Sequence, residues 1–277
     1  MFKPFARKLL AAGVLCASAA GAHASFIINL NFSGLTAVQE SYFAAAKSFW
    51  ESEITGYQAG ISLTGFTIDA HGAGIDGVGG ILGAAGPTAG VSQGGFLLTT
   101  TGAMDFDTAD IDAMIAGGSF TDVIKHEMAH VIGFGTLWTF NGVYADGTGR
   151  YTGAHALAAY RAEFNEPTAT FVPVELGGGS GTANGHWDEV DGGAGGASDR
   201  FKNELMSGWL NAPNHVSQTT LASFQDIGYT LQLGTVPEPG TIGLVLASLA
   251  MLAGANTRRR HPTPAPRPTG CRQTRRR

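Results

Sequence analysis

Cysteine is almost absent from this chain of 277 residues, and its absence limits how a site can be built. The two cysteines, Cys16 and Cys271, lie in the terminal segments. No disulfide can therefore form within the region between them, and no thiolate there can act as a metal ligand or nucleophile.

Positive charge is almost as scarce in the central part of the chain. Three of the 17 lysines and arginines precede residue 25 and eight follow residue 255, so six lie between these positions. All 22 acidic residues lie in that same stretch, and its formal net charge is therefore −16. Because a strongly acidic surface repels a phosphate backbone, we expect no nucleic-acid partner.

The N-terminus has the pattern of a secretory signal peptide. Residues 1–24 contain three early basic residues, then an apolar run from Leu9 to Ala20, and finally Ala22-His23-Ala24, which is a small-residue cleavage site. We therefore expect an exported protein whose mature chain begins near Ser25.

A stiff linker, an apolar segment and an arginine cluster follow one another near the C-terminus. Val236-Pro237-Glu238-Pro239-Gly240 precedes the apolar residues 241–255, and three arginines follow at 258–260. The apolar segment is shorter than the roughly 20 residues of a typical transmembrane helix. Because basic residues prefer the cytoplasmic side, we expect a transient membrane association through 241–255, with the preceding domain facing outward. The alternative is a core helix followed by a tail.

A short histidine motif stands at the centre of the chain. His126 and His130 lie four residues apart, so on an α-helix both imidazoles project from one face. Two neutral imidazoles at this spacing can occupy two corners of a tetrahedral zinc site. Glu127 follows the first histidine, where it can act as general base toward the water that a catalytic zinc activates.

A catalytic zinc needs a third protein ligand and keeps its fourth position open. In the commonest metzincin pattern a histidine lies six residues after the second ligand, but here that position is Thr136. The candidates further along the chain are His155, His186 and His215. We favour His186, since it lies in a glycine-rich segment that can return to the metal, twenty residues before Met206.

Three sequence motifs together resemble leishmanolysin-type metzincins over about residues 100–230. They are His126-Glu127-Met128-Ala129-His130, then Gly185-His186-Trp187, and finally Asn203-Glu204-Leu205-Met206-Ser207-Gly208. The resemblance implies a zinc peptidase in which His126, His130 and His186 bind zinc. It further implies that Glu127 is the general base and that Met206 forms the turn beneath the metal. The cysteine-bearing inhibitory segment of that family has no counterpart here.

The C-terminal pattern resembles a second family signature, the PEP-CTERM sorting signal of Gram-negative bacteria. This resemblance implies sorting to the cell surface or the extracellular space, with processing of residues 236–260 by a membrane-embedded sorting protease. The basic tail 261–277 extends beyond the point where such signals usually end.

These patterns predict an α+β fold of the zincin-like, metzincin type. Residues 25–135 are expected to form an N-terminal subdomain with a mixed twisted sheet and the active-site helix. Residues 136–235 are expected to form a smaller irregular subdomain that carries the third zinc ligand and the Met-turn.

Hydrophobic periodicity and capping residues predict the individual elements. We expect strands at 26–32, 61–70 and 169–176, helices at 36–53, 154–163 and 217–229, and loops with short edge strands at 71–95. Thr121 or Asp122 should cap the histidine helix, and Gly133 or Gly135 should end it.

Several acidic residues allow more than one interpretation. The aspartates between 105 and 112 could bind calcium, but we favour Asp107 or Thr108 as the cap of a short helix through Met114. Asp226 could be the partner of a ligand histidine, although a surface position on the last helix is the simpler interpretation.

The sequence therefore predicts an exported zinc endopeptidase that acts on proteins or peptides. One alternative is a zincin whose third ligand is Glu163 or Glu189. Another is a surface or biofilm-matrix protein that keeps the zinc site only as a structural element. A structural zinc usually has four protein ligands, so a fourth ligand would favour that alternative.

Overall fold

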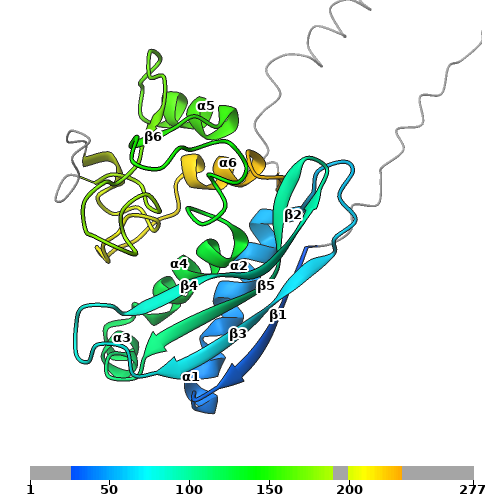
Figure 1. The fold of residues 1–277 in the computed structure, drawn as a ribbon. Coiled ribbons are helices and arrows are strands. Elements are labelled where there is room, and N and C mark those ends of the chain that lie inside the picture. Colours follow the sequence, from blue (N-terminus) through cyan, green and yellow to red (C-terminus); the bar gives the residue numbers. More distant parts are fainter. Residues whose placement is uncertain (1–25, 190–198, 233–277) are drawn as a thin grey trace, which may run out of the picture. The chain divides into compact units, whose positions relative to one another are not determined.

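The computed structural model describes residues 26–189 and 199–232. A four-stranded mixed sheet with the order β1-β3-β5-β4 forms the base of the fold (Figure 1). The strands β1 (Ile27–Ser33), β3 (Gly65–Ala73) and β5 (Phe96–Asp107) are parallel, and β4 (Gly83–Gln93) pairs antiparallel with β5. The predicted α+β class with a mixed sheet is confirmed.

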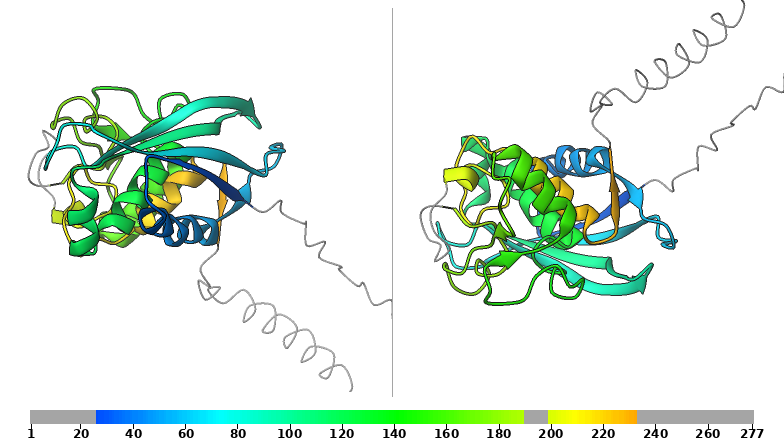
Figure 2. Two further views of the ribbon diagram at one scale, coloured as in Figure 1. Left: turned by 90° about the horizontal axis from the view of Figure 1, so that it is seen from below. Right: turned by 90° about the horizontal axis from the view of Figure 1, so that it is seen from above.

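Helices cover one face of this sheet (Figure 2). These are α1 (Ala37–Ser41), α2 (Phe43–Glu53) and α4 (Phe120–Ile132), with the short α3 (Ile111–Gly117) between β5 and α4. Fully buried aromatic side chains fill the space between helices and sheet, among them Phe43, Phe106 and Phe120. Their edge-to-face contacts hold α2 and α4 over the strands.

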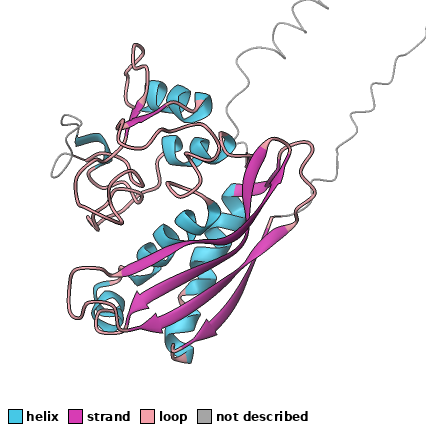
Figure 3. Cartoon of the chain, in the orientation of Figure 1, coloured by secondary structure: helices cyan, strands magenta, loops and turns pink. Residues whose placement is uncertain are grey.

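Loops dominate the chain after α4, as Figure 3 shows. The regular elements there are β6 (Arg150–Tyr151), α5 (Ala154–Glu163), β7 (Val172–Pro173), a 3₁₀ turn (Asp199–Phe201), α6 (Gln218–Gln225) and β8 (Tyr229–Leu231). Helices α5 and α6 pack on each other, and β8 pairs with β2 (Ile54–Tyr57) of the N-terminal half. The described chain after α4 therefore contains shorter regular elements than the part before it.

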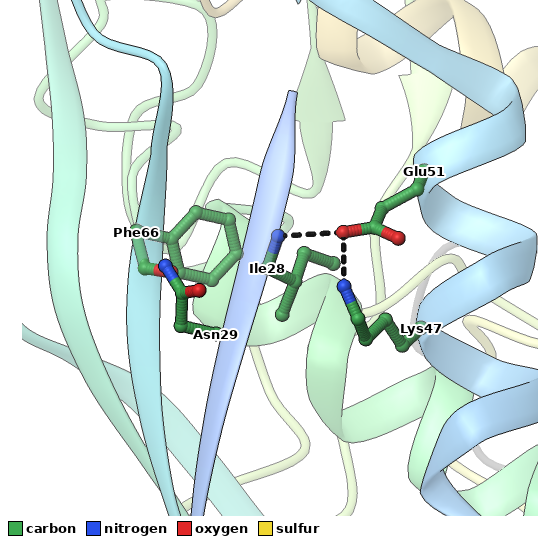
Figure 4. Close-up of polar contacts among 5 residues, drawn as sticks. All are labelled: Ile28, Asn29, Lys47, Glu51 and Phe66. Atoms are coloured by element: carbon green, nitrogen blue, oxygen red, sulfur yellow. Dashed lines mark hydrogen bonds and ion pairs between the residues drawn. The ribbon is translucent and has the colours of Figure 1, made fainter. Parts of the chain in front are cut away.

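One carboxylate joins α2 to the edge strand β1. Glu51 accepts a hydrogen bond from the backbone nitrogen of Ile28 at 2.8 Å and forms an ion pair with Lys47 (Figure 4). The backbone N–H of Ile28 thus has a partner on the helix, and the contact fixes α2 along the sheet.

The long strand β4 corrects the expectation of loops and short edge strands at 71–95. Its sequence is rich in glycine and alanine and lacks apolar alternation, so periodicity does not reveal it. The ladder with β5 forms the strand instead, and it continues through a register shift between Pro87 and Ala89. Proline is tolerated there because β4 is an edge strand.

Other boundaries also differ from the prediction. The helix expected at 36–53 is interrupted at Tyr42, the strand expected from residue 61 begins at Gly65, and β7 covers only two residues of 169–176. Ser217 does cap α6 through Thr220, but the helix ends at Gln225, three residues before Gly228. The helix at 154–163 is confirmed.

Asp107 does not cap α3, contrary to our expectation. Its carboxylate accepts hydrogen bonds from the backbone nitrogens of Asp76, Gly77 and Ala109 at 2.8–2.9 Å, and these bonds lower its pKa. Asp110 occupies the cap position, but its side chain accepts from Gly79 instead of the helix. Both carboxylates therefore organise the loop before β4.

The terminal segments lie outside the described residues. The predicted domain boundaries, including the one at residue 135, stay predictions. None of the helices within 26–189 and 199–232 is long and apolar enough to cross a membrane. This finding gives no support to the membrane segment expected at 241–255. That segment, the expected signal peptide and the basic tail all lie outside the described residues.

Candidate metal centre

Helix α4 carries two of the predicted metal ligands on one face. The Nε2 atoms of His126 and His130 lie 3.0 Å apart, and the His130 side chain is buried. The helix begins at Phe120, and its N-cap is Ser119 instead of the expected Thr121 or Asp122. The Ser119 hydroxyl donates to the carbonyl of Met114. Gly133 ends the helix with a φ of 133°, as predicted.

His186 reaches the same point from a small ladder in the irregular half. Trp187 pairs antiparallel with Val174 and parallel with Ser207, and its backbone nitrogen donates to the carbonyl of Met206 at 3.0 Å. The Nε2 of His186 lies 3.1 Å from that of His126 and 3.0 Å from that of His130. The structure thus brings the three predicted ligands together.

Backbone carbonyls orient all three imidazole rings. The Nδ1 of His126 lies 2.6 Å from the Leu205 carbonyl, that of His130 2.9 Å from the Phe134 carbonyl, and that of His186 2.8 Å from the Thr182 carbonyl. A carbonyl can only accept, so each Nδ1 carries the proton. In the neutral ring the Nε2 atom is then unprotonated and carries a lone pair. The lone pairs of the three Nε2 atoms face one another.

Burial keeps these rings neutral. It lowers the pKa of His126, lowers that of His130 well below its usual range, and lowers that of His186 to about 3. The neighbouring imidazoles add to the effect for His130 and His186. Neutral imidazole is the form that binds a metal, so loading the site requires no loss of a proton.

The three nitrogens fit a tetrahedral zinc ion. With Zn–N bonds of about 2.0–2.1 Å, two ligands of a tetrahedron lie about 3.3 Å apart. The observed separations of 3.0–3.1 Å are close to this value. Among the described residues, no other group of three histidine, cysteine, aspartate or glutamate side chains brings its ligand atoms within 4.8 Å of one another.

Gly135 lets the His186 segment approach the end of α4. A Cβ atom at Gly135 would lie 2.3 Å from the carbonyl oxygen of Gly185, and the φ of Gly135 is 71°. Only glycine permits this close crossing of two backbones without strain. Thr136, which takes the place of the usual third ligand, instead donates its hydroxyl to the His130 carbonyl at 2.6 Å.

Glu127 is buried on the same helix, with a side chain only 5% exposed. Burial raises the pKa of this carboxyl to about 8 in the absence of a metal cation. Gly83, the first residue of β4, lies against it: a Cβ at Gly83 would be 3.0 Å from the Glu127 Oε1. The carboxylate therefore occupies a limited space between α4 and the edge strand.

Met206 and Trp187 are both fully buried beside this site. Residues 204–207 form a turn that contains Met206, and in it the Ser207 nitrogen donates to the Glu204 carbonyl. Trp187 stacks on Trp138 at a ring-centroid distance of 4.9 Å, within an aromatic cluster that also includes Phe134, Tyr151 and Phe201. This cluster stabilises the backbone directly after His186.

The alternative ligands all lie outside the three-histidine group. Glu163 accepts from the backbone nitrogens of Gln218 and Thr219, and thus holds the start of α6. Glu189 is buried, and burial raises its pKa to about 7. Neither His155 nor His215 joins the group.

Asp226 is not a partner of a ligand histidine. It accepts from the Tyr151 hydroxyl and from the backbone nitrogens of His155 and Ala156, and so caps α5.

Two family models match the chain. The leishmanolysin model matches residues 96–233, which include β5, α4, the His186 segment and α6. This region is leishmanolysin-like. The PEP-CTERM protein-sorting motif matches residues 235–260. A search of curated proteins gave no significant match.

Both resemblances predicted from the sequence are confirmed by these matches. A leishmanolysin-like region implies a metallopeptidase, which would act on proteins or peptides. The sorting motif indicates export and sorting to the cell surface in bacteria. The ligand set, the general base, zinc itself and the metzincin subclass go beyond these matches.

Sequence reasoning missed the groups that position the leishmanolysin-like site. The carbonyls of Leu205, Phe134 and Thr182 carry no signal in the sequence, because every residue has a carbonyl. Gly83 and Gly135 were visible only as members of a glycine-rich chain. A glycine is required only where another segment lies too close for a Cβ atom, and the sequence does not show which segments come this close.

Proposed function

We propose that this protein is an exported zinc-dependent endopeptidase in which His126, His130 and His186 bind the metal. The observation that carries the proposal is the meeting of three Nε2 atoms at 3.0–3.1 Å, each on a ring whose Nδ1 proton is held by a carbonyl. Three facing lone pairs repel one another, and a bound cation turns this repulsion into coordination.

The three histidines leave one position of a tetrahedral zinc open. When bound, zinc would activate a water and polarise the scissile carbonyl of a peptide. Glu127 would take the proton from the attacking water and transfer it to the leaving amine. Its position on α4, next to His126 and one turn from His130, suits this role.

The metzincin assignment is supported by the turn at 204–207. Met206 is buried in that turn, and the preceding Leu205 carbonyl holds the ring of His126. Met206 would support the site without taking part in the chemistry.

Export follows from the sorting motif at 235–260 together with the signal-like residues 1–24. We propose that a membrane-embedded sorting protease of a Gram-negative bacterium processes the C-terminal segment and leaves the enzyme at the cell surface or outside the cell.

A purely structural zinc site is the second candidate, and one observation weighs against it. Within the described ranges, no fourth histidine, cysteine or carboxylate joins the three-histidine group. Three protein ligands are typical of catalytic zinc and four of structural zinc.

Metal removal and restoration test the proposal. The purified chain should bind one equivalent of zinc and hydrolyse an unfolded protein substrate. A chelator should abolish hydrolysis, and added zinc should restore it. Zinc bound at one equivalent without any hydrolysis would favour the structural site.

A further inference from the structure

A fully buried carboxylate, Glu204, lies at the start of the Met-turn. Its Oε1 accepts from the backbone nitrogen of Ser217 at 3.0 Å, the Ser217 hydroxyl at 3.1 Å and the Thr220 hydroxyl at 2.6 Å. Its Oε2 accepts from the backbone nitrogen of Met206 at 2.5 Å. Among the described residues, no lysine, arginine or histidine forms an ion pair with this carboxylate.

These four hydrogen bonds connect Glu204 to two metal ligands through other residues. Leu205, the next residue, provides the carbonyl that accepts from His126. The Thr220 hydroxyl, which donates to Glu204, accepts from the indole nitrogen of Trp187 at 2.8 Å. Trp187 follows His186 directly and also donates its backbone nitrogen to Met206.

We propose that Glu204 is a positioning residue for the metal centre. It fixes the 204–206 backbone so that the Leu205 carbonyl orients the ring of His126. Through Thr220 it also fixes Trp187 and thereby the segment that carries His186. This inference deepens the proposed function and rests on it, because it assigns a role toward the same three ligands.

A carboxylate is required because each of its two oxygens accepts from a backbone N–H, which can only donate. An ionised carboxylate only accepts, whereas the amide of glutamine presents two N–H groups on one side. In a Glu204→Gln variant the amide NH2 would therefore face the backbone N–H of either Met206 or Ser217. Burial raises the pKa of Glu204, and the bonds from these three residues oppose that rise.

The matched control is Glu163, a second carboxylate at the start of α6. It accepts from the backbone nitrogens of Gln218 and Thr219 at 3.0–3.1 Å and from the Thr219 hydroxyl at 2.8 Å. It stabilises the same helix end as Glu204, but its hydrogen bonds do not reach the Met-turn. Glu163→Gln therefore measures the effect of a weaker α6 cap alone.

The experiment compares the purified full chain with Glu204→Gln, Glu163→Gln and Thr220→Val. For each we would measure zinc affinity by chelator competition, the visible spectrum of the cobalt-substituted protein, and the melting temperature. Loss of a group that orients a metal ligand typically costs about 10–100-fold in metal affinity. We expect this loss and an altered cobalt spectrum in Glu204→Gln, and a smaller change in the same direction in Thr220→Val. Glu163→Gln should keep the wild-type zinc affinity and cobalt spectrum and show only a lower melting temperature.

Two results would overturn the inference. One is wild-type zinc affinity and an unchanged cobalt spectrum in Glu204→Gln. The other is an equal loss in Glu163→Gln, because the effect would then belong to helix stability. If Glu204→Gln does not fold, Thr220→Val decides in the same way. A wild-type chain that binds neither metal would instead refute the proposed function.

Discussion

Replacing Gly83 with alanine tests whether Glu127 works from the position where the structure holds it. The added Cβ would lie 3.0 Å from the Glu127 Oε1, 3.1 Å from its Cγ and 3.2 Å from its Cδ. Ordinary contacts between such atoms begin at about 3.4 Å, so the carboxylate must move by a few tenths of an ångström.

The expected loss follows from the cost of misplacing a catalytic group. A displacement of about 1 Å can cost about 10²-fold in rate, so a few tenths should lower kcat on the order of 3–10-fold. Zinc content should not change. The three atoms nearest to a Cβ at Gly83 all belong to Glu127, and none is a ligand nitrogen. Hydrolysis of a fluorogenic peptide by the zinc-loaded enzyme gives kcat and KM separately.

Gly86 on the same strand supplies the control. A Cβ there would meet only the Thr136 Cγ2 at 3.8 Å, which is an ordinary contact. Gly86→Ala should therefore keep kcat within about twofold of the wild type. If Gly83→Ala retained full activity, or if both variants lost the same amount, the carboxylate would not be acting from this confined position.

Three further predictions concern the ligands and the chain ends. His186→Ala should lose bound zinc and activity, whereas His155→Ala should keep both; zinc stoichiometry of the two variants distinguishes them. Gly135→Ala should lower the free energy of unfolding by about 1–3 kcal/mol, because a non-glycine residue at a φ of 71° is strained and its Cβ would lie 2.3 Å from the Gly185 carbonyl. Denaturant unfolding measures this, and an unchanged midpoint would contradict it. Deleting 236–277 should give a soluble, active enzyme, and an aggregated product would show that this segment belongs to the core.

The residues of the candidate site could be predicted from the sequence, because few residue types can bind a metal or act as a general base. His126, Glu127 and His130 follow from the spacing of a helix face, and His186 follows from its glycine-rich surroundings and its distance from Met206. The inference that these residues bind a metal does not depend on how the rest of the chain folds. The family match and the three-histidine group agree with that reasoning.

The strand β4 and the roles of the acidic residues could not be predicted in the same way. β4 is stabilised by its ladder with β5 and not by a pattern of its own. Asp107, Glu163 and Asp226 all bind backbone nitrogens of distant segments, in a loop or at the start of a helix. A carboxylate shows in the sequence that it can accept hydrogen bonds, but not which distant N–H groups it meets.

Exchanging Glu127 for glutamine, with zinc content and hydrolysis measured on the same sample, tests the central claim most directly. The amide keeps the size of the side chain but cannot take a proton from water. A general base typically contributes about 10²–10⁴-fold, so hydrolysis should fall by that factor while one zinc per chain stays bound. A Glu127→Gln protein that cleaves its substrate at the wild-type rate would contradict the account, as would a wild-type chain that hydrolyses peptides without any bound metal.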